Sequence, residues 1–416
     1  MISVIITIFS FVWVCFVDAK SSANVAGRRT QFISVPHSIG SKYELTVHSY
    51  GPQDAPVSVY IQASAHADEL PGMLVLHHLM NDLDMLQSEG LIHQKITLVP
   101  YANPIGLAQD LLGSHIGRFS LSSGTNFNRE YEDYSAKIES LIEDGSLMLS
   151  MDDAAQNVAM IRQAMKNEIR KTLDDDTLSS ESVLKYNILK LACDADVVLD
   201  LHCDTNALVH MYTHTHLWPA LRDLAGDIDA ECTLLAEDSG GTCLDEACSN
   251  VWYHVSRRYP QYPVPMACES ATLELRGESD VNDDLAKKDA LAIRTFLHRR
   301  GYLSLQDGRP VPTARPPPRE ATPLNGVDFL GSATTGLLIM KKELGDVVEH
   351  GDTVAEVIRI DDPDAARVPI KARSKGLLFC MAHPSRRLVG PGRGIVAKIA
   401  GEESLSWRRG NLLTAR

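Results

Sequence analysis

The sequence predicts an α/β domain with a mixed, mainly parallel sheet and flanking helices, followed by a small all-β domain. Between residues 30 and 305, short runs rich in Val, Ile and Leu alternate with amphipathic stretches, a pattern typical of parallel α/β sheets. After a proline-rich stretch, short β-rich runs are separated by glycines and show little helical periodicity. The two patterns indicate two structural domains in one chain.

Six runs are expected to form strands of the α/β domain. The runs KITLVPY and DADVVLDLH are dense in Val, Ile and Leu, as strands covered on both faces tend to be. The six expected strands are residues 43–49, 57–64, 95–101, 196–202, 208–213 and 271–276.

Four stretches with helical periodicity are expected to be the flanking helices. Pro71 suits the first turn of the first one, because proline lacks the N–H that this position leaves unpaired. The four expected helices are residues 71–86, 152–173, 183–193 and 283–299.

Residues 306–323, QDGRPVPTARPPPREATP, are predicted to be a linker. Proline has a fixed φ and no backbone N–H, so this stretch is expected to hold neither a helix nor a central strand. It separates the α/β domain, residues 30–305, from β-rich residues 324–402, and residues 403–416 follow as a tail.

The β-rich segment contains a weak internal repeat. GLLIM at 336–340 recurs as GLLFC at 376–380, and VVEHGDTVAEVI at 347–358 recurs as LVGPGRGIVAKI at 388–399. Two copies of strand–turn–strand predict a small β sandwich with pseudo-twofold symmetry, which resembles the barrel-sandwich fold of lipoyl and biotinyl carriers. The hairpin tip that carries the modified lysine in those carriers is missing, so we expect a structural or oligomerising domain.

Composition and charge exclude some classes of function. The chain of 416 residues is 44% hydrophobic and 23% charged, as is ordinary for a soluble globular protein with a real core. Its formal net charge is −14, and the acidic residues are scattered. A nucleic-acid partner is not expected, because phosphate backbones require a basic surface.

Residues 1–19 resemble a secretory signal peptide. An apolar run of about 16 residues, short for a membrane span, precedes Val17-Asp18-Ala19, which suits cleavage after Ala19. No basic residue stands next to Met1, which leaves a short membrane anchor or a different start codon open. A cleaved signal peptide predicts a secreted or extracytoplasmic protein, and without one we expect a cytoplasmic protein. No other stable membrane partner is expected.

The cysteine pattern does not indicate a metal ribbon or a dense set of disulfides. Of the eight cysteines, Cys15 lies in the N-terminal segment, and the others are odd in number and form no CxxC motif. Cys243 and Cys248 are a candidate disulfide if the protein is exported. Otherwise, we expect free and mostly buried thiols.

Three features stand at the carboxyl ends of expected strands, where an open α/β sheet binds its ligands. His66 and Glu69 follow the second expected strand, His202 ends the fourth, and Glu274 lies in the last. Two histidines and one glutamate form a three-ligand set that leaves zinc a fourth position for water, as in catalytic sites. Each feature alone has a simpler explanation: Asp68 or Glu69 also suits a helix N-terminus, and a strand-end histidine is usually only a hydrogen-bonded side chain.

The motifs between these features, taken in order, indicate which family of proteins the chain resembles. NPIG (103–106) follows the third expected strand, and Arg118 and NFNRE (126–130) come next. Asn-Pro-x-Gly, an arginine, Asn-Arg, Asp-Leu-His and a late strand glutamate, in this order, resemble the zinc carboxypeptidase clan. Within that clan the chain is similar to the succinylglutamate desuccinylase/aspartoacylase branch over about residues 55–300, and the appended β domain suits that branch.

The resemblance implies one zinc ion per chain, bound by His66, Glu69 and His202. It also implies that Glu274 is the general base and acid. Arg118 would polarise the scissile carbonyl and stabilise its oxyanion.

Three further residues are expected to contact the substrate. The resemblance implies that Asn128 and Arg129 hold a substrate carboxylate, which a guanidinium group matches bidentately. Arg276, two residues after Glu274, is expected to share its strand face and to be a second residue that binds an anionic group of the substrate.

Some assignments have competitors, and one position departs from the family pattern. Glu269 and Glu278 compete with Glu274, which lies between two leucines inside the strand. Relatives commonly carry aspartate two positions before the Asn of Asn-Arg, where this chain has Asn126. A neutral amide still orients a metal-binding histidine but raises its basicity less than a carboxylate does. Asp200, on the strand face of His202, is a candidate to supply the missing carboxylate.

Together, these features predict a zinc-dependent hydrolase that cleaves the amide bond of an N-acyl amino acid or a related small amide. In this hypothesis, zinc-activated water attacks the acyl carbon. A metallocarboxypeptidase acting on peptide C-termini is the alternative enzyme, and a non-catalytic zinc-binding scaffold is the alternative of another class. The expected partners are a small N-acyl amino acid and, through the C-terminal domain, a second copy of the chain.

Overall fold

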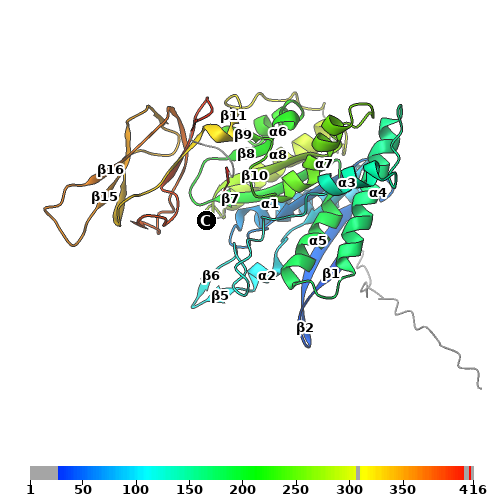
Figure 1. Ribbon diagram of the computed structural model, residues 1–416, viewed down its shortest axis with the longest axis horizontal. Helices are drawn as coiled ribbons and strands as arrows, with labels where there is room; N and C mark the ends of the chain where they lie inside the picture. The colour runs from blue at the N-terminus through cyan, green and yellow to red at the C-terminus, as the bar shows by residue number, and fades with distance from the viewer. Residues whose placement is uncertain (1–26, 306–309, 407–411, 414–416) are drawn as a thin grey trace, which may run out of the picture.

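A nine-stranded sheet forms the centre of the larger domain in this computed structural model, which describes residues 27–305, 310–406 and 412–413 (Figure 1). The strand order is β1-β2-β4-β3-β7-β10-β8-β9-β11. The inner pairs β3–β4, β3–β7, β7–β10 and β8–β9 are parallel, whereas β1–β2, β2–β4 and β8–β10 are antiparallel. The strands are β1 (Arg29–Ser38), β2 (Ser41–Tyr50), β3 (Ser58–Ala63), β4 (Lys95–Val99), β7 (Val197–Asp204), β8 (His210–His214), β9 (Cys232–Ala236), β10 (Glu269–Gly277) and β11 (Thr322–Pro323).

Helices cover both faces of this sheet. One face packs against α1 (Pro71–Ser88), α6 (Trp218–Asp227) and α8 (Asp283–Arg299). The other packs against α3 (Ser135–Glu143), α4 (Ala154–Leu173), α5 (Ser180–Ala192) and α7 (Leu244–Arg258). Strand β7 is apolar on both faces because successive side chains of a strand point to opposite sides. Val197 and Leu199 belong to one core, and Val198 belongs to the other.

The predicted fold class is confirmed, and the expected strands and helices are present with small shifts at their ends. The sequence patterns did not predict β1, β9, α3, α6 and α7, nor the short elements α2 (Pro104–Leu107), β5 (Asp110–Leu111) and β6 (Ser114–His115). Helix α7 illustrates the reason, because its residues include β-branched and aromatic ones with modest helix propensity. Its buried Val251, Trp252 and Val255 pack into the core, so tertiary burial stabilises a helix that local preference does not indicate.

The C-terminal segment forms two four-stranded sheets, with strand orders β12-β19-β17-β14 and β16-β15-β13-β18. The short strand of each sequence repeat pairs with the long strand of the other repeat, β14 with β17 and β18 with β13. This exchange gives the predicted β sandwich its pseudo-twofold arrangement. The strands are β12 (Val327–Leu330), β13 (Gly336–Met340), β14 (Val347–Val348), β15 (Thr353–Ile358), β16 (Val368–Lys371), β17 (Gly376–Met381), β18 (Leu388–Val389) and β19 (Ala397–Ala400).

The described part of the proline-rich stretch runs against α6 before it reaches the C-terminal sheets. A side chain at Gly226 would lie 1.9 Å from the carbonyl oxygen of Arg315, so the close approach requires glycine there. Thr322 and Pro323 pair with β9 at the edge of the large sheet, where proline is tolerated.

Two statements concern segments that could enter a membrane. The signal peptide predicted at residues 1–19 lies outside the described residues. Among the helices of the described ranges, none is long and apolar enough to cross a membrane.

Candidate functional site

The first functional segment is the turn between β3 and α1, which carries His66 and Glu69. Ser64 has a φ of 57°, and its hydroxyl donates to the backbone oxygen of Glu69 at 3.0 Å. The turn also rests on Gly117, where a Cβ would lie 2.2 Å from the backbone nitrogen of Asp68. These contacts fix the turn so that the side chains of His66 and Glu69 point at the same place.

His66, Glu69 and His202 form a buried cluster at the carboxyl ends of β3 and β7. Their potential ligand atoms all lie within 4.8 Å of one another. Nδ1 of His66 is 2.9 Å from Oε1 of Glu69, and Nδ1 of His202 is 2.7 Å from its Oε2. The two imidazoles therefore turn the same ring atom toward one carboxylate.

Asn126 holds the ring of His66 from the outside. Its Oδ1 lies 2.9 Å from Nε2 of His66 and also accepts the backbone N–H of Asn128 at 3.0 Å. An amide oxygen accepts hydrogen bonds, so Nε2 carries the proton and Nδ1 keeps its lone pair for the centre of the cluster. The expectation that the amide at Asn126 orients a cluster histidine is met by this geometry.

His202 is held by a buried polar chain that begins on β3. Its Nε2 lies 3.0 Å from Oδ2 of Asp200, and Gln62 donates to Oδ1 of Asp200 at 2.9 Å. The hydroxyl of Tyr60 in turn donates to Gln62 at 2.8 Å. Asp200 thus supports the second histidine, whereas sequence reasoning proposed it as a substitute for a carboxylate beside the first. Tyr60 and Gln62 were missed because a strand with buried polar residues has no motif.

The donor set fits a divalent metal such as zinc. Burial, and then the positive charge of Arg118, lower the pKa of His66 to about 4, so this ring is neutral and can donate a lone pair. Burial raises the pKa of Glu69, but the two imidazoles outweigh it and hold that pKa well below its usual range. Burial lowers the pKa of His202, but the charges of Asp200 and Glu69 outweigh it and raise that pKa well above its usual value. His66 and Glu69 thus match the ligand states that zinc requires, and His202 would release a proton when it binds the metal.

Arg118 and Arg129 both line the cavity that opens on this cluster. Nη1 of Arg118 lies 3.1 Å from Nδ1 of His66 and 3.2 Å from Oε1 of Glu69, so its guanidinium stands beside the candidate ligand atoms. Arg129 donates to the backbone oxygen of Asn128 at 2.7 Å and contacts the sulfur of Cys243 at 3.2 Å. Its buried Nε has no partner among the described residues.

Asn128 lies beside the cluster. Its Nδ2 is 2.9 Å from Nε2 of His202, and its Oδ1 accepts the N–H of Leu244 at the start of α7 at 3.3 Å. The amide therefore connects the cluster to the helix N-terminus, in addition to lining the cavity.

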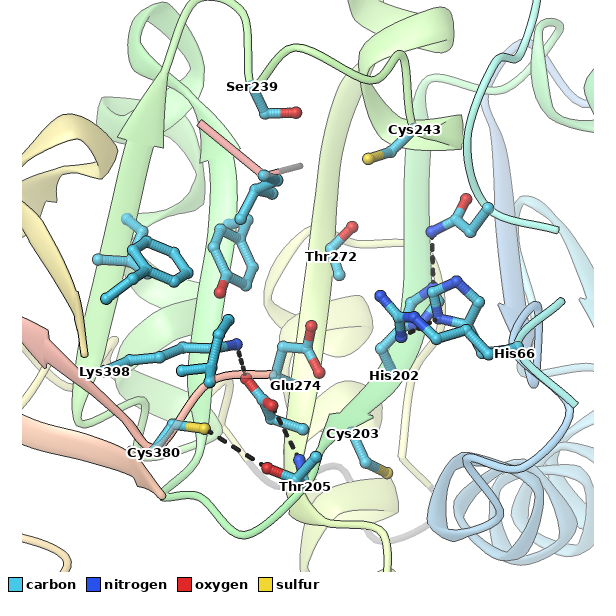
Figure 2. Close-up of a pocket in the computed structure, with 18 of the residues that line it drawn as sticks. His66, His202, Cys203, Thr205, Ser239, Cys243, Thr272, Glu274, Cys380 and Lys398 are labelled. Carbon is cyan, nitrogen blue, oxygen red and sulfur yellow. Dashed lines mark hydrogen bonds and ion pairs between the residues drawn. The ribbon is translucent and has the colours of Figure 1, made fainter. Parts of the chain in front are cut away.

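Glu274 faces the cavity from the middle of the sheet. Strand β10 sets it level with His202 on β7 and with His210 on β8. Its buried Oε2 has no partner in the described part of the chain. Burial, and then the nearby charge of Glu69, raise the pKa of this carboxyl to about 8. Figure 2 shows Glu274 beside the two histidines, with Lys398 on its other side.

Comparisons with known proteins agree with this site. Residues 55–300 match the model of the succinylglutamate desuccinylase/aspartoacylase catalytic domain. The chain belongs to that family. The predicted family and its place in the zinc carboxypeptidase-like clan are therefore confirmed, and the chain is a hydrolase of the desuccinylase/aspartoacylase type. No curated protein matches the sequence.

Solved structures of the family share the fold over both domains. A succinylglutamate desuccinylase/aspartoacylase from Shewanella frigidimarina is 23% identical, covers 90% of this chain and 97% of its own, and has a TM-score of 0.77. A family protein from Shewanella amazonensis is 24% identical, covers 89% of this chain and 98% of its own, and has a TM-score of 0.76. The product-bound ectoine utilization protein EutE (DoeB) from Ruegeria pomeroyi is 17% identical, covers 90% and 95%, and has a TM-score of 0.61.

The expectation that Arg276 shares the strand face of Glu274 is wrong. The register of β10 against β7 shifts between Glu274 and Gly277, and Arg276 has a φ of 69°. This bulge ends the alternation of faces, and the guanidinium forms a buried ion pair with Asp289 on α8. Arg276 does not line the cavity among the described residues. Of the competing glutamates, Glu269 pairs with Arg300 at 3.1 Å, and Glu278 lies at the cavity wall.

The C-terminal domain contributes to the site, which its interpretation as a structural or oligomerising domain did not include. Phe329, Cys380 and Lys398 line the cavity, and Lys398 is buried in an ion pair with Asp204. The N–H of Leu208 donates to Phe379 at 2.9 Å and joins the two domains. A lysine within a short β run gives no sequence signal for this position.

The thiols and two residues of β8 complete the description of the site. The seven cysteines in the described ranges are free and buried, so the alternative disulfide between Cys243 and Cys248 is absent there. Tyr212 lines the cavity, whereas His210 bonds to the backbone of Leu208 at 2.8 Å and contacts the ring of Phe379.

Proposed function

We propose that this family member is a zinc-dependent amidohydrolase that removes the acyl group from an N-acyl amino acid or a related small amide. The observation that carries the proposal is the buried cluster of His66, Glu69 and His202, whose potential ligand atoms lie within 4.8 Å of one another. Beside it lies Glu274, whose Oε2 has no partner among the residues that the structure describes. A three-ligand set with an adjacent carboxylate is typical of catalytic metal sites.

His66, Glu69 and His202 would hold the zinc ion. Bound there, zinc would supply a Lewis acid for the attacking water and for the scissile carbonyl. The protein supports this use because Asn126 orients the ring of His66 and Asp200 places a carboxylate 3.0 Å from Nε2 of His202, and outer partners of this kind tune metal affinity.

Glu274 would move the proton. Its Oε atoms face the cavity, and the carboxylate would accept a proton from the attacking water and then donate it to the nitrogen of the leaving amine. Burial, and then the charge of Glu69, raise the pKa of this carboxyl to about 8, which supports its use as a proton donor to the leaving amine. A nearby cation would lower that pKa and favour the ionised form that a base needs.

The two arginines would bind the substrate from different sides of the amide. Arg118, at 3.1 Å from Nδ1 of His66, is close enough to the cluster to stabilise the negative charge that develops on the carbonyl oxygen. Arg129 has an unpartnered Nε at the cavity and would bind the carboxylate of the amino acid.

A direct experiment combines metal analysis with a substrate panel. Purified protein should contain about one zinc per chain, lose activity with a chelator and regain it with zinc. It should hydrolyse N-acyl amino acids, and Glu274→Gln should lower kcat by about 1,000-fold or more while zinc stays bound. Activity only on blocked dipeptides would instead support a carboxypeptidase.

The matched control lies on the same strand. Glu269→Gln changes a carboxylate at the other end of β10, where it pairs with Arg300, and should leave kcat within about twofold of wild type. A protein without stoichiometric zinc, or one whose hydrolysis is unaffected by Glu274→Gln, would support the scaffold alternative.

A further inference from the structure

The cavity has two ends of different chemical character. The end at β3 and β7 holds the histidine cluster with Arg118 and Arg129. Figure 2 shows Glu274 between this end and the opposite one, where Lys398 enters from the C-terminal domain. Near Lys398, whose ammonium group lies over the ring of Phe329, an apolar cluster contributes Tyr212, Leu234, Ala236, Leu324, Phe329 and Leu413 to the lining.

The apolar end is part of the folded core. Leu234 and Leu324 are each 1% exposed, and Tyr212 is 8% exposed. All three belong to the hydrophobic cluster that joins the two domains, and Phe329 packs against it. This wall is therefore preformed, and a ligand group that fills the space beside it meets ordered apolar side chains.

The ammonium group of Lys398 is already paired. Lys398 and Asp204 form a buried ion pair, and Nε2 of His210 lies 3.9 Å from the same carboxylate. A second substrate carboxylate would have to compete with Asp204 for the ammonium group. Burying an additional charge without a partner is unfavourable, so the space beside Phe329 disfavours a second carboxylate. Arg386 and Arg393, which also line the cavity, are exposed residues of the C-terminal domain.

The volume leaves room for a large apolar group. The whole cavity, from the histidine cluster to Phe329, measures about 580 Å³, which is within the range of about 300–1,000 Å³ that is typical of small-molecule sites. Each methylene that replaces water beside an apolar wall contributes about 0.8 kcal/mol, or about fourfold in binding. A short acetylated substrate would leave this gain unused.

We propose that the substrate carries an uncharged apolar group of several carbon atoms, which occupies the space lined by Tyr212, Ala236 and Phe329. This inference rests on the proposed amide hydrolysis and names the substrate class of the same site. The apolar group is either the acyl chain or the side chain of the amino acid, because both are attached next to the scissile amide.

Two substrate series identify the source of the apolar group. The first lengthens the acyl chain on glycine from acetyl to octanoyl, and the second varies the side chain of N-acetyl amino acids from glycine to leucine and phenylalanine. We expect kcat/KM to rise by about fourfold per methylene in one series until the space is filled. N-acetylaspartate and N-succinylglutamate should be poorer substrates than the best apolar compound.

Each contrary result has a distinct meaning. A flat kcat/KM in both series, or the highest value for the two charged compounds, would overturn the inference while leaving the proposed hydrolysis intact. No hydrolysis of any of these compounds by the zinc-loaded protein would overturn the proposed function itself.

A variant of Phe329 tests whether this side chain contacts the apolar group of the substrate. Phe329→Ala should lower kcat/KM by about 10-fold or more for the best apolar substrate and by less than about threefold for N-acetylglycine. Leu337→Ala on β13 is the matched control, because Leu337 is 37% exposed and does not line the cavity. An equal loss on both substrates would contradict the specific role of Phe329.

A second variant keeps the test valid if Phe329→Ala does not fold. Ala236→Phe places a large side chain at the half-buried end of β9 that lines the cavity. It should reduce hydrolysis of the longest apolar substrates and retain hydrolysis of N-acetylglycine. Unchanged preference for long apolar substrates in this variant would argue against the assigned location.

Discussion

At the scale of single residues, the amide oxygen of Asn126 determines the orientation of the His66 ring. Its amide oxygen accepts from two donors, Nε2 of His66 and the N–H of Asn128, which fixes both the amide and the ring. The same position would hold a carboxylate if the residue were aspartate. The difference between the two is one negative charge, and this charge acts on the basicity of the imidazole.

We therefore expect Asn126→Asp to tighten zinc binding by about 10-fold, because a carboxylate behind His66 makes its Nδ1 a stronger donor. Competition with a chromogenic chelator measures the change in dissociation constant. Asn126→Ala is the control, and it should weaken binding because the ring loses its partner. Equal affinities of the aspartate variant and wild type would contradict a role of the charge at this position in zinc affinity.

Asp245 predicts a pH dependence of stability. Burial, and then the charge of Glu246, raise its pKa from 3.8 to about 7. The folded state therefore keeps a proton that the unfolded state releases, so the free energy of unfolding falls as the pH rises from about 4 to about 7. Asp245→Asn removes this loss and should raise Tm at pH 8 by several degrees, with little gain at pH 4.

Thermal unfolding of the two proteins in metal-free buffer at both pH values checks the Asp245 prediction. Asp54→Asn, a change at an exposed loop position, is the control and should shift Tm by less than about 1 °C at either pH. A stabilisation by Asp245→Asn that is the same at pH 4 and pH 8 would contradict the linkage.

At the scale of secondary-structure elements, the end of β10 shows how a bulge separates two neighbouring residues. Glu274 remains in register with its neighbouring strands and faces the cavity, whereas Arg276, at a positive φ, turns to Asp289 on α8. The guanidinium thereby connects the sheet to a helix and is 15% exposed. Its position indicates a role in stability.

Asp289→Ala should lower the free energy of unfolding by roughly 3 kcal/mol, since it leaves the charge of Arg276 buried without its partner. The kcat/KM of the folded fraction should stay within about twofold of wild type. Lys287→Ala on the same helix is the control, because its pair with Asp283 is exposed to solvent and should contribute little to stability. Denaturant unfolding and steady-state kinetics measure both quantities, and a large selective loss of kcat/KM in Asp289→Ala would restore a substrate role for Arg276.

At the scale of the whole molecule, the second domain completes the cavity of the first. Phe379 is fully buried in the cluster that joins them, its ring lies 4.9 Å from that of His210, and its carbonyl accepts from Leu208. The loop that follows β7, the strand of His202, is thereby fixed against the C-terminal sheet. Stability of the domain contact and shape of the cavity are thus coupled.

Phe379→Ala should consequently lower both Tm and kcat/KM, with a cost of about 3 kcal/mol or more in stability. Val354→Ala removes buried carbon atoms from the core of the β sandwich itself, and it should lower Tm without changing kcat/KM. Calorimetry and kinetics on the two variants provide the comparison. Retention of full kcat/KM in a folded Phe379→Ala protein would show that the domain contact does not shape the cavity.

The sequence by itself determined the alternation of strands and helices, the β sandwich, and the proximity of four side chains at one edge of the sheet, His66, Glu69, His202 and Glu274. It could do so because strand runs have a short period and the carboxyl ends of neighbouring parallel strands meet at one edge. Helices such as α7, with modest propensity, could not be read locally because they are stabilised by burial.

Only the tertiary structure decided the remainder of the site. The bulge that turns Arg276 away depends on how β10 pairs with β7, and Lys398 and Phe329 reach the cavity because one domain docks on another. The polar chain behind His202 likewise joins residues of two strands that are distant in sequence. These contacts are long-range, and the physical reason that no local pattern shows them is that their free energy arises only when both partners are already folded.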